Sequence, residues 1–157
     1  MAKGNYARWL YKGQHPHLIA KMYMKLWSAV AYTGIAQNYL VSLEVIGRKT
    51  GRILSLPVVI AVVSGQRYLV SMLGDNAQWV QNVRAAGGSA FIRAGGRKEV
   101  LLEEVPAEER APILKVYLKR APGARPHIPV SKDAPLADFE KVAADFPVFR
   151  IVSKQAI

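Results

Sequence analysis

The 157-residue chain contains no cysteine, and acidic side chains are almost missing from its first hundred residues. Without cysteine, the chain cannot form a disulfide scaffold, a thiolate metal site or a cysteine nucleophile. The first hundred residues carry 13 lysines and arginines against three acids (Glu44, Asp75 and Glu99), which gives +10 of the formal net charge of +11. A positive excess of this size in one part of the chain predicts an anionic partner: a phosphate, a polycarboxylate, nucleic acid or an acidic membrane surface.

The chain also lacks a hydrophobic run long enough to cross a membrane, which takes about 20 apolar residues in a helix. The best candidate for a membrane-spanning helix, the apolar stretch at residues 26–36, is too short, and Lys21 and Lys25 lie just before it. Hydrophobic residues still make up 51% of the sequence, which is enough for the core of one domain. We therefore expect a flexible basic N-terminal arm at residues 1–16, a single domain at residues 17–157 and a cytoplasmic location. Peripheral contact with the inner face of the membrane is an alternative.

The motifs of several enzyme classes are missing. The sequence contains neither of the glycine-rich nucleotide fingerprints, GxGxxG and GxxxxGK(S/T), and neither HExxH nor GxSxG. The three histidines, His15, His17 and His127, have no spacing that predicts a metal site, so no metal is expected. A hydrolase built on the chain's own side chains is therefore not supported. An enzyme with this sequence would take its reactivity from an organic cofactor.

Hydrophobic periodicity predicts a helix that begins at Leu18 and ends at Gly34, with apolar residues at i, i+3 and i+4. Its apolar stripe, which includes Leu26, Trp27 and Val30, is expected to pack on a sheet, and contact with a lipid surface is the alternative. Further helices are expected at residues 77–86, 106–120 and 137–144, and strands at residues 40–46, 53–63, 68–71, 89–93, 97–105 and 146–152.

The order of these segments indicates the fold class. Because the strands are not regularly separated by helices, a parallel βαβ sheet is not expected. Pro57, inside one predicted strand, indicates an edge strand or a bent one, since proline has no N–H to donate. The pattern favours an α+β, mostly β fold in which antiparallel strands close into a small barrel with flanking helices.

The first segment with functional chemistry is the turn at residues 47–52. Two glycines frame a stretch that contains Arg48, Lys49, Thr50 and Arg52. Guanidinium groups match the geometry of both phosphate and carboxylate, so this turn is a candidate anion site. The alternative is an ordinary hairpin turn whose basic residues are solvated.

The second such segment, residues 69–75, leads from a predicted strand toward a predicted helix. A strand that leads directly into a helix exposes backbone N–H groups, which is a further way to hold an anion. Asp75 or Asn76 is expected to cap the helix. Trp79, Asn82 and Arg84, within that helix, are candidates to line a pocket, although Trp79 and Val83 could equally belong to the core.

Together these pieces resemble a known family. The matching motifs, in order, are Gly-Arg-Lys-Thr-Gly-Arg at 47–52, Leu-Pro-Val at 56–58, Tyr-Leu-Val-Ser at 68–71, the segment at 79–88 and Phe-Pro-Val-Phe-Arg-Ile at 146–151. Their order and spacing resemble those of the deazaflavin-dependent nitroreductase and quinone reductase family, from Tyr39 to Val152. The resemblance implies a split β-barrel of the flavin-reductase type and coenzyme F420, a 5-deazaflavin whose tail carries a phosphate and several glutamates.

The resemblance also implies an activity and a site. The activity is that of an oxidoreductase, which transfers a hydride from reduced F420 to a quinone, an enone or a nitro compound. The implied cofactor-binding residues are Arg48, Lys49, Thr50 and Arg52 for the phosphate and tail, Leu54, Ser55, Leu56 and Pro57 beside the cofactor, Val70, Ser71, Met72 and Leu73 through their backbone, and Trp79, Asn82 and Val83 near it. Some relatives have Ser-Lys-Gly-Gly at residues 71–74, so one cation of the family is missing here.

No catalytic side chain is predicted, and Tyr23, Trp27, Tyr32 and Tyr117 are only candidate walls of a pocket. A small-molecule electron acceptor is the expected partner, and contact with an anionic membrane and a homodimer are considered as well. Nucleic acid is not expected, because the aromatic residues do not alternate with the basic ones as stacking platforms require. The alternative function is a non-catalytic binder of a hydrophobic ligand, a lipid surface or another cofactor, such as FMN or haem.

Overall fold

The computed structural model describes residues 18–34 and 38–154, and it describes side chains from residue 24 onward. The N-terminal arm predicted at residues 1–16 and the side chain of Tyr23 lie outside the described part.

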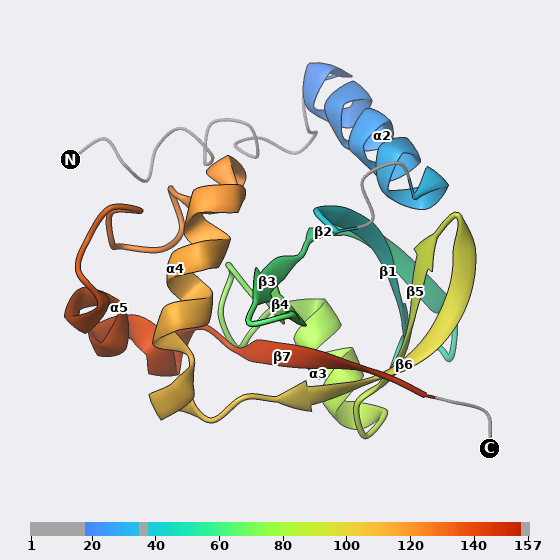
Figure 1. Cartoon of the computed structure of the whole chain (residues 1–157). Coiled ribbons are helices and arrows are strands. Elements are labelled where there is room, and N and C mark those ends of the chain that lie inside the picture. The colour runs from blue at the N-terminus through green and yellow to red at the C-terminus, as the bar shows by residue number, and fades with distance from the viewer. Residues whose placement is uncertain (1–17, 35–37, 155–157) are drawn as a thin grey trace.

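Within that part, seven antiparallel strands form one curled sheet, and helices flank it (Figure 1). The strands are β1 (Leu40–Ile46), β2 (Ile53–Val59), β3 (Ala61–Val63), β4 (Gln66–Val70), β5 (Ser89–Ala94), β6 (Gly96–Glu104) and β7 (Val148–Ser153). The helices are α2 (Leu18–Thr33), α3 (Gln78–Ala85), α4 (Ala111–Arg120) and α5 (Leu136–Val142), with short 3-10 turns η2 (Ala107–Glu109), η3 (Pro122–Ala124) and η4 (Ala143–Asp145). The α+β, mostly β split barrel predicted from the sequence is thereby confirmed.

The sheet curls because its two edge strands follow one another in the chain. The strand order is β2-β1-β5-β6-β7-β4-β3, so that β2 and β3 stand at opposite edges. The sequence predicts one strand at residues 53–63, but the chain bends at Ile60 and then pairs with β4 at the far edge. Ile60 is fully buried, and its N–H donates a 2.7 Å hydrogen bond to the carbonyl of Tyr39. The bend therefore turns a seven-stranded sheet into a half-barrel.

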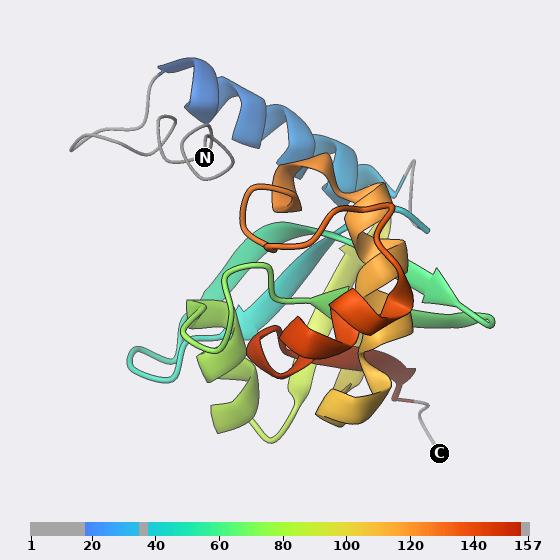
Figure 2. The same ribbon diagram turned by 90° about the vertical axis from the view of Figure 1, so that its left-hand side faces the viewer.

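Two apolar cores form on the two faces of this sheet, because side chains alternate along each strand. One core fills the inside of the half-barrel and includes Leu43, Leu69 and Phe149. The other lies between the sheet and helices α4 and α5, and Leu114 and Phe139 are fully buried there. Figure 2 shows α4 and α5 together on one side of the sheet.

Helix α2 packs on the outside of the sheet, with Ala31 fully buried and Trp27 and Val30 half-buried. Leu26, which the periodicity placed on the packed stripe, is 63% exposed instead. That part of the prediction is wrong, because α2 packs on the strands with the side that carries Trp27 and Ala31. None of the helices in the described ranges combines the length and the apolar character that crossing a membrane requires.

The end of α2 is fixed by Gly34, as the sequence predicts. Gly34 has a φ of +77°, and a Cβ built at this position would lie 2.5 Å from the carbonyl carbon of Ala94. The N–H of Gly95 donates a 2.9 Å hydrogen bond to the carbonyl of Tyr32, at the same contact. The close approach ties the helix to the hairpin between β5 and β6.

We predict that Gly34→Ala lowers the free energy of unfolding by more than about 2 kcal/mol, since a left-handed φ and a backbone overlap add together. Gly65→Ala is the matched control, because Gly65 has a φ of +76° but no atom within 4 Å of a Cβ. The control is expected to lose only about 1 kcal/mol, the cost of the φ alone. Urea denaturation measures both changes, and equal losses would show that the contact with Ala94 does not matter.

Candidate functional site

A cavity of about 230 Å³ opens between β2, the end of β4 and the C-terminal end of α4. Its walls are almost entirely apolar, which is typical of small-molecule and cofactor sites. The residues that line it are Leu56, Pro57, Val58, Val59, Val70, Met72, Leu73, Trp79, Tyr117, Ala121, Gly123 and Ala124. The ring of Trp79 is positioned by Phe149, whose centroid is 5.5 Å away.

The turn at residues 47–52, named here the basic loop, is closed by its own backbone. The N–H of Gly47 donates to the carbonyl of Arg52 at 2.7 Å, and the N–H of Gly51 donates to the carbonyl of Gly47 at 2.8 Å. The Thr50 hydroxyl oxygen accepts a 3.2 Å hydrogen bond from the N–H of Arg52. The side chains of Arg48, Lys49, Thr50 and Arg52 are all exposed. The loop is thus an ordered turn that presents three cations to solvent.

Acidic side chains do not neutralise these cations within the described residues, because the acids of the first hundred residues are paired elsewhere. Glu44 is bound by Arg93 at 2.9 Å and by Arg97 at 2.7 Å. Burial raises the pKa of Glu44, but the two arginine hydrogen bonds outweigh it, so this pKa lies below its ordinary value and the carboxylate stays charged.

The other two acids are also committed. Asp75 pairs with Arg84 at 2.8 Å, and Glu99 pairs with Lys154 at 3.0 Å. The basic loop therefore keeps its full charge.

Asn82 links the basic loop to helix α3. Its side chain is only 3% exposed, and its Oδ1 accepts hydrogen bonds from the backbone N–H of Arg48 at 3.0 Å and from the guanidinium of Arg48 at 2.9 Å. No described group accepts a hydrogen bond from its Nδ2. The side-chain amide of asparagine can donate two hydrogen bonds, so Nδ2 is a candidate donor to a ligand. Trp79 lies about one turn earlier on the same helix and reaches the cavity.

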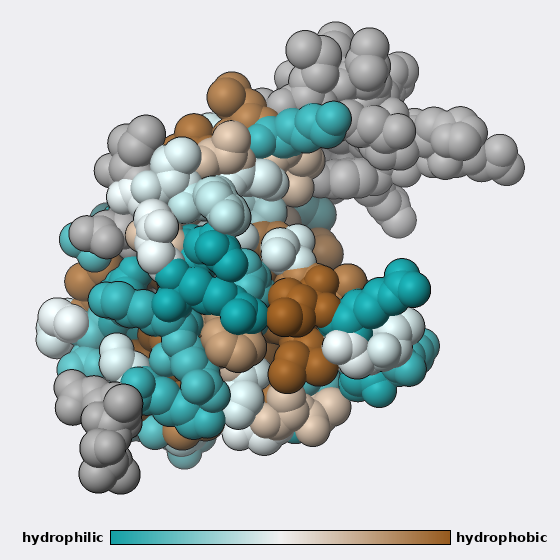
Figure 3. All heavy atoms as spheres, turned by 90° about the vertical axis from the view of Figure 1, so that its right-hand side faces the viewer, coloured by the Kyte–Doolittle hydropathy of each residue, from teal (hydrophilic) through white to brown (hydrophobic). Residues whose placement is uncertain are grey.

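Strand β2 connects the basic loop to the cavity. The chain leaves the loop at Arg52, and the cavity wall begins at Leu56, a distance of about 13 Å for four residues of extended chain. Leu54 and Ser55 are exposed between these points, and Ile53 and Ile46 form an exposed apolar pair where β1 and β2 meet the loop. Figure 3 shows hydrophobic and hydrophilic atoms gathered side by side on this face. A ligand with an apolar head and an anionic tail matches this sequence of surfaces.

The structure brings together most of the residues that the sequence analysis singled out. Six of them line the cavity: Leu56, Pro57, Val70, Met72, Leu73 and Trp79. Ser71 and Val83 do not line it, and neither do the pocket candidates Asn82 and Arg84. Ser71 is buried, with its hydroxyl donating to the carbonyl of Gly74 at 2.7 Å, and Val83 lies in the core of the half-barrel. The Asx cap expected for α3 is absent, because Ala77 occupies the N-cap without a side-chain hydrogen bond and Asp75 pairs with Arg84 instead.

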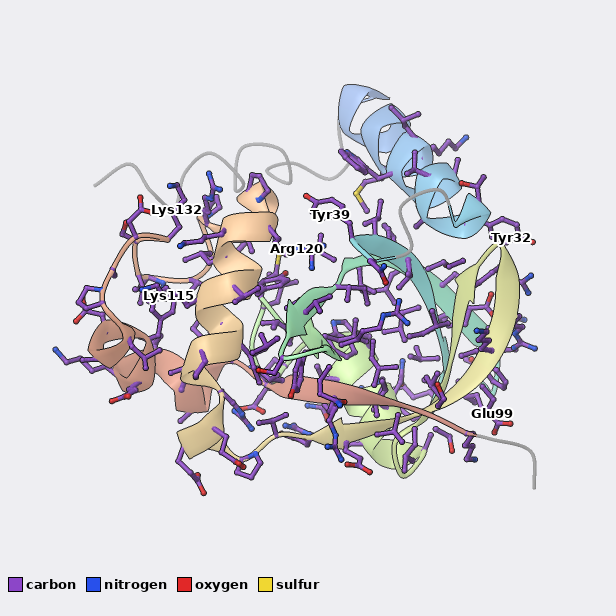
Figure 4. All side chains as sticks on the ribbon, in the orientation of Figure 1. Tyr32, Tyr39, Glu99, Lys115, Arg120 and Lys132 are labelled. Atoms are coloured by element: carbon purple, nitrogen blue, oxygen red, sulfur yellow. The ribbon has the colours of Figure 1, made fainter. Side chains whose placement is uncertain are left out.

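Helix α4 contributes part of the wall that the sequence did not identify. Tyr117 was predicted only as one of four candidate walls, and Ala121 and the η3 turn were not predicted at all. No local motif marks them, since they reach the cavity only because α4 packs on β3 and β4. In Figure 4, Tyr32 stands at the C-terminal end of α2, away from α4, and the Arg93 guanidinium lies 4.9 Å from its ring centroid.

Tyr117 supplies the only hydroxyl among the residues that line the cavity. Its side chain is 5% exposed, and its hydroxyl makes no hydrogen bond to a described residue. Burial, with a smaller contribution from Tyr39, raises the pKa of Tyr117 well above its ordinary value. The phenol therefore keeps its proton at neutral pH. Tyr39 and Arg120 lie close together nearby (Figure 4), and the Tyr39 hydroxyl donates to the carbonyl of Arg120.

A family model described as "F420H(2)-dependent quinone reductase" matches residues 17–133. A comparison with curated proteins gives no match.

Solved structures share the fold at low identity. A conserved hypothetical protein from Mycobacterium tuberculosis has a TM-score of 0.54 and 16% identity, with 81% of this chain and 79% of that chain covered. A proposed 5-nitroimidazole antibiotic resistance protein from Bacteroides thetaiotaomicron has a TM-score of 0.51 and 10% identity, with 86% and 80% covered. A heme binding protein from Mycobacterium smegmatis has a TM-score of 0.50 and 17% identity, with 82% of this chain and 51% of that chain covered. At these identities, the three structures establish the fold alone.

We predict that Asn82→Ala destabilises the protein by about 1–2 kcal/mol, because the N–H and the guanidinium of Arg48 lose their acceptor. The backbone amide of Arg48 should also exchange its hydrogen faster. Thr50→Ala is the control, since it removes only an exposed hydrogen bond within the same loop. Urea denaturation and hydrogen exchange measure the two effects. Equal exchange at Arg48 in both variants would show that Asn82 does not hold the loop.

Proposed function

Because the chain belongs to the F420H(2)-dependent quinone reductase family, we propose that it transfers a hydride from reduced coenzyme F420 to an electron-poor organic acceptor, such as a quinone, an enone or a nitro compound. The family description names F420 and not FMN. When bound, the reduced 5-deazaflavin supplies the hydride. The observation that carries the proposal is a basic loop without acidic partners among the described residues, at one end of a strand whose other end lines an apolar cavity.

The basic loop fits the phosphate and the glutamates of the F420 tail. Arg48 can present its guanidinium while its backbone is held by Asn82, and Lys49 and Arg52 add two further cations. The amide Nδ2 of Asn82 adds an uncharged N–H donor next to Arg48. Phosphate and carboxylate oxygens accept hydrogen bonds from the three cations, and such charge-assisted bonds are about twice as strong as neutral ones.

The cavity fits a flat redox ring and an apolar acceptor. Its lining includes Leu56, Met72 and Trp79 and contains no charged side chain. Apolar walls exclude water from the reacting atoms, and a fixed ring such as Trp79 orients a planar ligand beside it. The role proposed for the cavity is therefore to hold donor and acceptor against each other, because the bound cofactor supplies the reactivity.

The hydroxyl of Tyr117 is the proposed hydrogen-bond donor to the acceptor. Tyr117 lines the cavity, and its hydroxyl keeps its proton at neutral pH and makes no hydrogen bond to a described residue. A hydrogen bond to a carbonyl or nitro oxygen becomes stronger as negative charge develops on that oxygen during hydride transfer. Solvent can supply the proton that completes the product.

We predict that the double variant Lys49→Gln/Arg52→Gln raises the dissociation constant for F420 at least tenfold, because two of the three loop cations are lost. Quenching of the deazaflavin fluorescence in low salt measures the binding, which should weaken as salt is added. The control is Lys98→Gln/Lys119→Gln, which removes the same charge from exposed lysines that do not line the cavity. Equal losses in the two double variants, or no micromolar binding by the unaltered protein, would sink the proposal.

A second prediction concerns Tyr117. Tyr117→Phe should lower kcat/KM for a quinone about tenfold, the value of one hydrogen bond of roughly 1.4 kcal/mol in the transition state. Binding of F420 should change less than about twofold, and Tyr39→Phe, next to the cavity wall, should leave turnover near that of the unaltered protein. Steady-state kinetics with reduced F420 tests this. A Tyr117→Phe protein that retains full turnover would remove the hydroxyl from the mechanism.

A further inference from the structure

The segment between β4 and α3, residues 71–77, forms part of the cavity wall and is named here the pocket loop. Met72 and Leu73 line the cavity from it, and Leu73 is 60% exposed. The start of the pocket loop is fixed by Ser71, whose N–H donates to the carbonyl of Pro147 at 2.9 Å and whose hydroxyl donates to the carbonyl of Gly74 at 2.7 Å. Its far end is held by contacts to Asp75.

Two side chains of helix α3 bind Asp75. The side-chain amide of Gln81 donates to the carbonyl of Asp75 at 2.8 Å, and the guanidinium of Arg84 binds the Asp75 carboxylate at 2.8 Å. Residues three apart lie on the same side of a helix, so both side chains point back along α3 toward the pocket loop. They join α3 to the pocket loop, although the N-cap of α3 itself has no side-chain hydrogen bond.

Arg84 is itself held by Glu104, the last residue of strand β6. Its Nε donates to one oxygen of Glu104 at 3.0 Å, and its NH2 nitrogen donates to the other at 2.7 Å. This two-point contact fixes the plane of the guanidinium. Glu104 also accepts a 3.2 Å hydrogen bond from Arg110, which is 8% exposed.

The chain of contacts ends in the segment that also holds the start of the pocket loop. Arg110 donates to the carbonyl of Val105 at 2.8 Å and to the carbonyl of Ala143 at 3.1 Å. Residues 143–147, which include Pro147, therefore support the pocket loop at both ends: directly at Ser71, and at Asp75 through Arg110, Glu104 and Arg84. Two anchors on one support fix the position of the three residues between them, Met72, Leu73 and Gly74.

We infer that Arg84 is a positioning residue of the proposed reaction, which holds Met72 and Leu73 against the bound ligands through Asp75. The inference rests on the proposed function for its kinetic consequence but not for the anchoring itself. Without the anchor, ligand binding must order the pocket loop, and the free energy of ordering appears as weaker binding. Chemistry in the assembled complex is then little affected.

The first test needs no cofactor. In Arg84→Gln, the backbone amides of Gly74 and Ala77, which donate to the carbonyls of Ser71 at 3.2 Å and Gly74 at 3.4 Å, should exchange hydrogen at least threefold faster than in the unaltered protein, because local opening becomes easier. Arg150→Gln is the matched control, since Arg150 forms a similarly exposed ion pair of 2.6 Å with Glu103, and neither lines the cavity. Equal exchange in both variants would overturn the inference, whatever the protein proves to catalyse.

The second test is kinetic. Arg84→Gln should raise KM for the quinone about fivefold and change kcat less than about twofold, whereas Arg150→Gln should change neither. Arg84→Lys, which keeps a cation near Asp75, should recover part of the loss. Adding Asp75→Ala to Arg84→Gln should not raise KM further, because both substitutions remove the same contact, the ion pair between Asp75 and Arg84.

The outcomes separate the two proposals. If the rise in KM in the double variant equals the product of the rises in Asp75→Ala and Arg84→Gln, Arg84 does not act through Asp75 and the inference fails. An unchanged KM in Arg84→Gln would also overturn it. If the unaltered protein does not turn over a quinone at all, the proposed function fails, and hydrogen exchange alone decides the role of Arg84.

Discussion

The bend at Ile60 is the constraint on which the rest of the structure depends. Because β2 and β3 are consecutive yet pair at opposite edges of the sheet, the sheet has to curl until those edges approach. The curl creates an inside, which the barrel core fills, and a mouth, where β2 faces the ends of β4 and α4. The cavity lies at that mouth, and a flat sheet with the same strands would have no place for it.

Charge is distributed by the same architecture. Each of the three acids among the first hundred residues is bound by an arginine or lysine from another element: Glu44 across to β5 and β6, Asp75 within the α3 region and Glu99 at the end of β7. These pairs use up the negative charge on structural contacts. The basic loop therefore meets an anionic ligand with its charge intact, and that is the physical basis for its proposed role.

Helix α3 serves both ends of the proposed site although it spans only Gln78–Ala85. Trp79 reaches the cavity, Asn82 holds the basic loop, and Arg84 holds the pocket loop. A short helix can do this because its successive side chains point in different directions around the axis. A ligand that spans loop and cavity would thus contact two surfaces whose relative position one rigid element sets.

The sequence by itself determined the features that depend on local spacing. Periodicity and turn residues predicted nearly every helix and strand, the end of α2 at Gly34 and the composition of the basic loop, and the order of short motifs predicted the family. Only the tertiary structure decided that Tyr117 lines the cavity, that Leu26 faces solvent and that Asp75 pairs with Arg84 instead of capping α3. These features depend on which elements pack together, and contacts between distant residues leave no trace in the spacing of neighbours along the chain.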